Sequence, residues 1–242
     1  MRYLLECSYK GTSFHGWQIQ ENAESVQGYI QQALSLVLRQ DIEIMGSSRT
    51  DTGVHASQQF AHFDVSLALV NVDKIVYALN GILPKAIAIR RIVAVADSFH
   101  SRFDATHRRY VYRIAQEKNP FWQDVSYYYK SKLDIGKMNQ AGELMMKYID
   151  FQCFSKVHTD VMTFNCQIEM AYWEQQEAFL LFHIKADRFL RGMVRAIVGT
   201  MIEVGMGKIG LAEFEQIIEL KSRQKAGAAV PAAGLTLVEV GY

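Results

Sequence analysis

Residues 42–65 read IEIMGSSRTDTGVHASQQFAHFDV and place a polar loop between two apolar segments. Apolar residues dominate 42–45, and apolar and polar residues alternate over 58–64. Alternation with a period of two is typical of a half-buried strand, so the stretch predicts two strands joined by the loop 46–56. Asp51 stands in that loop. Loops on rigid strands often carry reactive side chains, although Ser, Asp and Gly are also the ordinary residues of a polar turn.

The pattern on both sides of this loop predicts an α+β half. Ser25 is a good N-cap, and the apolar residues after it recur at helical spacing. A second helix is expected to end before Pro84, because the residue before a proline disfavours helix. Strands are expected at 2–8, 42–45, 60–65 and 86–95, and helices from about 25 and at 73–80. The order strand, helix, strand, strand, helix, strand is that of the split βαβ, ferredoxin-like motif.

The second half repeats this theme. Strands are expected at 109–116, 163–175, 178–185 and 235–240, and helices at 135–148, 189–204 and 211–220. We therefore predict an α+β fold of two ferredoxin-like halves, which form a continuous, mostly antiparallel sheet with helices on one face and a central basic cleft. The domains are expected at 1–104, with the Asp51 loop, and at 105–242. The segment 221–231 is rich in Lys, Gly and Ala and is expected to be a mobile loop.

The amino-acid composition limits the classes of protein to which the chain can belong. Half of the 242 residues are apolar, which suffices for a large core. Lys and Arg number 26 against 25 Asp and Glu, so a nucleic-acid surface must arise from local clustering of charge. The cysteines, Cys7, Cys153 and Cys166, have no spacing typical of a disulfide framework or a zinc site, which favours a reducing cytoplasm. No apolar run is long enough for a signal peptide or a membrane span, so a soluble protein is expected.

The loop around Asp51 closely resembles the Arg-Thr-Asp-x-Gly-Val-His signature of the tRNA pseudouridine synthase A family. Other elements of that family are matched along nearly the whole chain. They are similar at Tyr9, Gly11, Gly16, Trp17 and Gln18; at Phe99, His100, Arg102, Phe103, Ala105, Thr106, Arg108, Arg109, Tyr110 and Tyr112; at Lys185, Ala186, Phe189, Leu190, Met193, Val194, Arg195, Ile197, Val198 and Gly199; and at Gly234 and Leu235. Lys10 replaces the usual Asp, and Ser48 stands where Gly is common.

The resemblance implies an isomerase that converts uridine to pseudouridine. Asp51 would be the nucleophile that attacks C6 of the base or C1′ of the ribose, so its carboxylate must be ionised and aimed. The resemblance assigns Arg195 as its ion-pair partner in a forked geometry. Tyr110 would stack on the target uracil, and its hydroxyl could assist the proton that leaves C5. No cofactor and no metal are expected.

The resemblance also implies the substrate and the assembly. The substrate would be the anticodon stem-loop of several tRNAs, at uridines 38, 39 and 40, and the enzyme would be a homodimer with no membrane partner.

Arginines supply candidate contacts to the RNA backbone. Arg188, Arg191 and Arg195 fall three and four residues apart, so on the predicted helix they would form one basic stripe. Arg49, beside the nucleophile, would hold the flipped nucleotide or fill the gap that the extruded base leaves. Arg109 lies in an unusually basic strand.

Three further residues have simpler expected roles. Leu235 is expected to form a wall of the pocket. We expect His55 to order the loop through a hydrogen bond, and His62 to be an ordinary strand residue.

Two other classes of function stay open from the residues alone. One is a metal-dependent nuclease or hydrolase that uses Asp51 with Asp64 or Asp104, although the acidic residues have no ligand spacing. The other is an RNA-binding module without chemistry, because ferredoxin-like halves also bind single-stranded RNA. The combination of Asp51, Tyr110 and Arg195 argues against the second.

Overall fold

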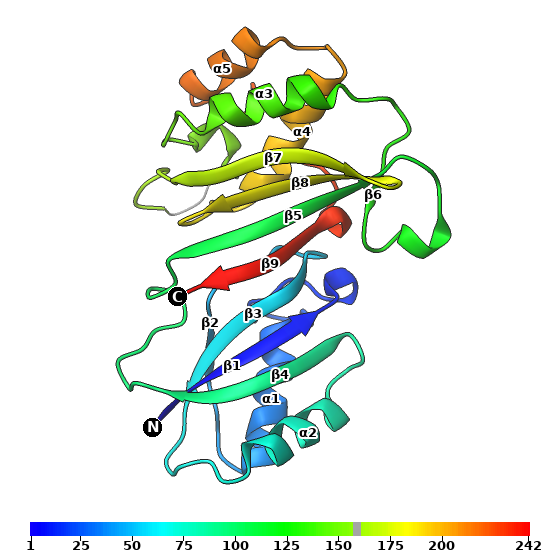
Figure 1. Cartoon of the computed structure of the whole chain (residues 1–242). Helices are drawn as coiled ribbons and strands as arrows, with labels where there is room; N and C mark the ends of the chain where they lie inside the picture. Colours follow the sequence, from blue (N-terminus) through cyan, green and yellow to red (C-terminus); the bar gives the residue numbers. More distant parts are fainter. Residues whose placement is uncertain (157–160) are drawn as a thin grey trace. The chain divides into compact units, whose positions relative to one another are not determined.

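A computed structural model describes residues 1–156 and 161–242 (Figure 1). The chain forms two compact units, of which the first is Met1–Thr106 with Thr236–Tyr242 and the second is His107–Leu235. The sequence-based division after residue 104 differs in its boundary and in the placement of the last strand. As a division into domains it stays a prediction.

The first unit has the predicted alternation of strands and helices. Strand β1 lies between β3 and β4 and is antiparallel to both, while β2 and β9 share the other edge of β3. Its elements are β1 (Arg2–Tyr9), the short 3-10 helix η1 (Gly11–Ser13), α1 (Val26–Leu38), β2 (Ile44–Gly46), β3 (His55–Asp64), α2 (Val72–Ile82), β4 (Ile87–Val95) and nearly all of β9 (Leu235–Gly241). Helices α1 and α2 pack on one face of this sheet (Figure 1).

Helix α1 begins where the sequence predicts. The Oγ of Ser25 accepts a hydrogen bond from the Gly28 N–H at 3.2 Å, as an N-cap does. The apolar side chains Val26, Ile30 and Leu34 are fully buried against the sheet. Burial at this spacing supplies most of the stability of such a helix, because isolated helices of its length are marginal in water.

The second unit has its own antiparallel sheet. Strand β8 lies between β5 and β7, with Phe182 opposite both Tyr112 and Trp173. Its elements are β5 (His107–Ala115), the 3-10 helix η2 (Pro120–Trp122), β6 (Tyr127–Tyr128), α3 (Ile135–Met145), the 3-10 helix η3 (Gln152–Phe154), β7 (Ile168–Gln176), β8 (Phe179–Ala186), α4 (Met193–Gly205), α5 (Leu211–Glu219) and the 3-10 helix η4 (Ala232–Gly234). Helix α3 packs on β7 and α4, and α5 packs on α3 (Figure 1).

The predicted fold class is confirmed. Within the described residues, nine strands pair mostly antiparallel inside the two units, and five α-helices accompany them. The first unit reproduces the split βαβ order in full. The central cleft stays a prediction.

Three predicted elements are wrong in their extent. The strand expected at 60–65 begins earlier, at His55, and the strand expected at 163–175 begins later, at Ile168. The helix expected at 189–204 begins only at Met193, because Gly192 adopts a left-handed conformation with φ +72°. Arg188 lies in an irregular segment and Arg191 in a turn, both before the helix, so the predicted basic stripe with Arg195 on one helix face does not exist. Apart from Arg195 and Glu203, every residue of α4 is buried. A helix apolar around nearly its whole circumference belongs in a core.

His62 on β3 gives the first unit a pH-dependent stability. Burial, together with charge interactions with Arg2 and His100, lowers the pKa of His62 from 6.5 to about 4. The folded protein therefore keeps His62 neutral at a pH where the unfolded chain binds a proton. Unfolding takes up this proton between pH 6.5 and about 4, so the free energy of unfolding falls as the pH falls through that window.

We expect His62→Asn to flatten this dependence. Asn can still accept the Ser101 N–H that His62 Nδ1 accepts at 3.1 Å, but it does not titrate. Urea unfolding of both proteins at pH 7 and pH 5 measures the difference. Equal losses of stability on acidification would mean that His62 does not contribute to the pH dependence.

Candidate active site

Asp51 lies in the loop between β2 and β3, on a tight turn. The Val54 N–H donates to the Asp51 carbonyl at 3.1 Å, and Gly53 supplies a positive φ of +79° within that turn. Asp51 is half-buried, whereas Thr50 before it and Val54 after it are buried. The candidate nucleophile is therefore partly accessible on a loop whose flanks are fixed.

The segment after β1 braces this loop from both sides. The Tyr9 hydroxyl lies 2.8 Å from the Thr50 Oγ1, and the Trp17 N–H donates to the Thr50 carbonyl at 3.2 Å. On the other side of Asp51, the Gly53 N–H donates to the Phe14 carbonyl at 3.3 Å. Asp51 thus sits between two points that are tied to the same segment, residues 9–17.

Two glycines make this packing possible. A Cβ on Gly16, where φ is +93°, would lie 2.5 Å from the Thr50 carbonyl oxygen, and a Cβ on Gly11 would overlap the Val54 carbonyl. Only glycine tolerates such an approach of backbone to backbone. Sequence reasoning missed this role, since no local pattern shows that two backbone segments pack here. The signal available was their place in the matched family element.

His55 orders the loop as expected. It is the first residue of β3 and is buried, and its Nδ1 accepts a hydrogen bond from the Gly11 N–H at 2.9 Å. His62 is a strand residue, as predicted.

The start of the loop is fixed by a second set of bonds. The Ser47 Oγ donates to the Gln59 Oε1 at 2.6 Å, and the Gln59 side chain donates to the Ser48 carbonyl at 2.8 Å. Ser47 and Gln59 are buried, while Arg49 is exposed next to the turn. The loop therefore presents Arg49 to solvent from a fixed backbone.

In the second unit, Arg195 lies in the first turn of α4 and is half-buried. Its Nε–H donates to the Val230 carbonyl at 2.7 Å, and the Val230 N–H donates to the Arg195 carbonyl at 3.2 Å. The Gly227 N–H donates to the Thr200 Oγ1 at 2.9 Å. The segment 221–231 was expected to be a mobile loop. Its end is instead hydrogen-bonded to α4, at Arg195 and at Thr200.

Tyr110 is buried on β5, with its ring edge-on to Phe189 at 5.2 Å between ring centroids. Tyr112 shares this face of the strand, and its hydroxyl donates to the Pro231 carbonyl at 2.8 Å. Leu235, which follows η4, is also buried. Within the second unit, the segment 227–235 thus connects α4, which carries Arg195, with β5, which carries Tyr110.

The predicted phosphate-binding arginines lie on different elements, Arg109 on β5 and Arg188 and Arg191 in the segment before α4. Arg109 is half-buried and lies opposite Lys185 in the ladder, so strand alternation directs it to the face that Tyr110 does not share. Arg188 is half-buried, and its backbone N–H donates to the Asp187 carboxylate at 2.7 Å. Arg191 is exposed in the turn before α4.

Comparison with known proteins identifies the family. The family model described as tRNA pseudouridine synthase matches residues 7–104 and 149–242. The chain is 46% identical over 241 residues to the tRNA pseudouridine synthase A of Parabacteroides distasonis and 47% identical over 242 residues to that of Bacteroides fragilis, and each alignment covers 100% of this chain and 96% of the relative. The enzyme of the same name from Acetivibrio thermocellus is 39% identical, with 98% of both chains covered. The chain belongs to the tRNA pseudouridine synthase family.

Membership of the tRNA pseudouridine synthases makes the chain an isomerase. The ranges that match the family model contain Asp51, Arg195 and Leu235, whereas Tyr110 and Arg109 lie between them. The alignments to the first two relatives span these two residues as well, because they cover the whole chain.

The arrangement of acidic residues does not favour the metal-dependent alternative. Asp51 and Asp64 flank opposite ends of β3, so about 30 Å of strand separates them at the usual rise per residue. Asp64 forms a bidentate pair with Arg2, and Asp104 accepts the His100 N–H at 2.8 Å. In residues 1–156 and 161–242, no group of three or more His, Cys, Asp and Glu side chains could hold a metal ion.

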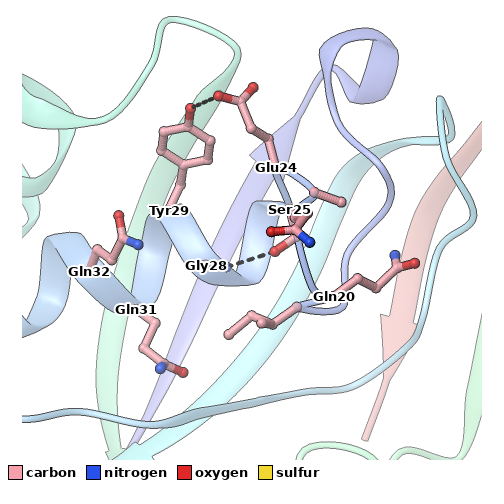
Figure 2. A pocket seen from close by; sticks show the side chains of 10 residues that line it. Gln20, Glu24, Ser25, Gly28, Tyr29, Gln31 and Gln32 are labelled. Atoms are coloured by element: carbon pink, nitrogen blue, oxygen red, sulfur yellow. Dashed lines mark hydrogen bonds between the residues drawn. The ribbon is translucent and has the colours of Figure 1, made fainter.

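A hollow of about 480 Å³ lies beside the start of α1 in the synthase (Figure 2). Figure 2 shows that amide side chains such as Gln20, Gln31 and Gln32 surround it, and Tyr29 donates to Glu24 at 2.9 Å. None of the predicted site residues lines it.

Across the described part of the chain, every helix is too short or too polar to cross a bilayer.

Gly16→Ala tests whether backbone packing holds the Asp51 loop. We expect the left-handed conformation to cost about 1–2 kcal/mol and the contact with the Thr50 carbonyl to add about 1–3 kcal/mol of overpacking, with a loss of turnover. Gly207→Ala is the matched control, since Gly207 has φ +68° but open space around its Cα. Urea unfolding and single-turnover rates measure both effects. Equal losses of stability and of turnover in the two variants would mean that the contact between Gly16 and the Thr50 carbonyl does not hold the loop.

Proposed function

We propose that this synthase converts uridine to pseudouridine at positions 38, 39 and 40 in the anticodon stem-loop of several tRNAs. The observation that carries the proposal is the Asp51 loop. Its signature resembles that of the pseudouridine synthase A family, and hydrogen bonds hold it on both sides of Asp51. A fixed backbone suits a carboxylate that must attack one defined atom.

The proposed reaction needs no redox change. The bond between C1′ and N1 breaks, the uracil turns, and a bond between C1′ and C5 forms. C5 loses a proton, N1 gains one, and the transient bond to the nucleophile breaks again, so substrate and product are isomers. Asp51 supplies the nucleophile, Arg195 holds the carboxylate ionised and oriented, and Tyr110 stacks on the uracil and assists the C5 proton. Phe189, edge-on to Tyr110, supports the plane in which that ring would meet a base. Leu235 forms a wall of the pocket.

RNA contacts are proposed for arginines at separate places and not for one helix face. Arg49, exposed beside Asp51, positions the flipped nucleotide. Arg188, Arg191 and Arg109 bind backbone phosphates. With a net charge of +1, affinity for tRNA depends on such local positive charge.

We also propose a homodimer that works in the cytoplasm without a metal or cofactor. The dimer rests on the resemblance alone. The location is supported by Cys7, Cys153 and Cys166, which are free and buried, since free thiols persist in a reducing compartment.

Asp51→Asn tests the chemistry. We expect folding and tRNA affinity to be nearly unchanged and pseudouridine formation to be abolished, because an amide cannot act as the nucleophile. Asp51→Glu should also lose about 100-fold, since one methylene displaces the carboxylate by about 1 Å. Mapping of pseudouridine in tRNA treated with each protein measures the outcome. Product from Asp51→Asn, or cleaved RNA that depends on a divalent metal, would contradict the assignment.

Arg195→Met tests the proposed ion pair. We expect the single-turnover rate to fall far more than the tRNA affinity, because the nucleophile loses its orienting partner. Arg195→Lys should rescue only partly, since an ammonium cannot form the fork.

Thr200→Val is the control for Arg195. It removes the hydroxyl that accepts the Gly227 N–H, and so loosens the segment that also accepts the Arg195 Nε–H, while it leaves Arg195 in place. If Thr200→Val lowers the rate as much as Arg195→Met, Arg195 acts through this segment and not on Asp51.

A further inference from the structure

The loop that carries Asp51 is bonded on both sides to residues 9–17, and two of these bonds use side chains. One joins the Tyr9 hydroxyl to the Thr50 Oγ1 at 2.8 Å, directly before Asp51. The other joins the Gly11 N–H to the His55 imidazole at 2.9 Å, directly after the turn. Both bonds are buried. Because Asp51 lies between their anchor points, the position of its backbone depends on them.

The bond from Gly11 also defines the chemical form of His55. A backbone N–H can only donate, so Nδ1 of His55 must accept through its lone pair. A ring that accepts at Nδ1 is neutral and carries its proton on Nε2. His55 is 5% exposed, and so it holds the Gly11 N–H away from water. Loss of the acceptor would leave that N–H buried without its present partner, a costly state that favours movement of the segment.

We propose that His55 is a positioning residue of the isomerisation. It fixes residues 9–17 against the turn 51–54 and thereby sets where the Asp51 carboxylate points, without touching the substrate itself. This proposal rests on the proposed role of Asp51 as the nucleophile. It adds that the neutral imidazole, with Nδ1 as an acceptor, is the form that supports turnover.

The local geometry supports a role in turnover and not only in folding. His55 stands four residues after Asp51, and the intervening Val54 N–H closes the turn onto the Asp51 carbonyl. The Gly11 backbone that His55 binds also packs against the Val54 carbonyl, where no Cβ would fit. A shift at His55 therefore moves the turn, and a misplacement of about 1 Å at a reacting group can cost about 100-fold in rate.

The chain provides a matched control on the same strand. His62 is also buried on β3, and its Nδ1 also accepts a backbone N–H, that of Ser101, at 3.1 Å. It lies at the end of β3 remote from Asp51. Removal of either imidazole should destabilise the fold in the same way, but only removal of His55 should disturb the nucleophile.

The experiment compares His55→Ala, His55→Asn and His62→Ala in the full chain. The Asn Oδ1 occupies nearly the place of the imidazole Nδ1 and accepts the same N–H. We expect His55→Ala to lower the single-turnover rate by about 10- to 100-fold with little change in the Kd for tRNA. His55→Asn should recover most of that rate, and His62→Ala should keep it. The thermal midpoints of the two Ala variants should fall by similar amounts.

Three outcomes would overturn the proposal. They are a normal rate in folded His55→Ala, no recovery in His55→Asn relative to His55→Ala, and an equal loss of rate in His62→Ala. Asp51→Asn, measured in the same assay, separates this proposal from the proposed function. If the wild-type protein forms no pseudouridine, or if Asp51→Asn remains active, the proposed function fails. If Asp51→Asn is inactive while His55→Ala is normal, only the role of His55 fails.

Discussion

The contact between the backbone at Gly16 and the backbone at Thr50 is the constraint on which the Asp51 loop depends. No side chain lies between the two segments there, because a Cβ on Gly16 would meet the Thr50 carbonyl at 2.5 Å. An aspartate has a short side chain, so its carboxylate follows the backbone closely. Nucleophilic attack requires reacting atoms about 3–3.5 Å apart and aligned, and a loop free to shift by 1 Å would lose most of that alignment. Glycine at this position thus allows the contact that fixes the backbone of the turn on which Asp51 lies.

The second unit uses the same device around Arg195. A Cβ on Gly199 would overlap the Ala228 carbonyl, and a Cβ on Gly227 would lie 2.9 Å from the Thr200 nitrogen. The close approach brings the Val230 carbonyl to the Arg195 Nε–H. In each unit, a proposed active-site residue is therefore placed by a contact between segments remote in the sequence, and glycine permits the contact. Rigid support of this kind helps to hold a functional side chain close to one geometry.

Local signals explain which parts of the fold the sequence predicts. Ser25 and the apolar spacing after it specify α1, because an N-cap and a buried stripe act within a few turns of chain. The predicted start of α4 is four residues early, since Phe189 and Leu190 continue the apolar pattern while Gly192 breaks it with a positive φ.

The hydrogen bonds that hold the Asp51 loop against residues 9–17 have no local signal in the sequence, because they depend on the register of β1 on β3. Asp51 and Arg195 are proposed as site residues through a family resemblance, and physical patterns alone indicate only one accessible carboxylate on a loop.

In the proposed site, Arg195 would combine two tasks that suit a guanidinium. Its Nε–H is bonded to the Val230 carbonyl, so a backbone atom of the segment 226–230 sets the plane of the group. In the proposed pair with Asp51, a carboxylate would then approach the edge formed by the two terminal nitrogens, which gives the end-on fork. A lysine has one nitrogen and could satisfy the carbonyl or the carboxylate, but not both in fixed directions. If Arg195 pairs with Asp51 as proposed, the Val230 carbonyl orients the guanidinium from one side while two donors remain on the other.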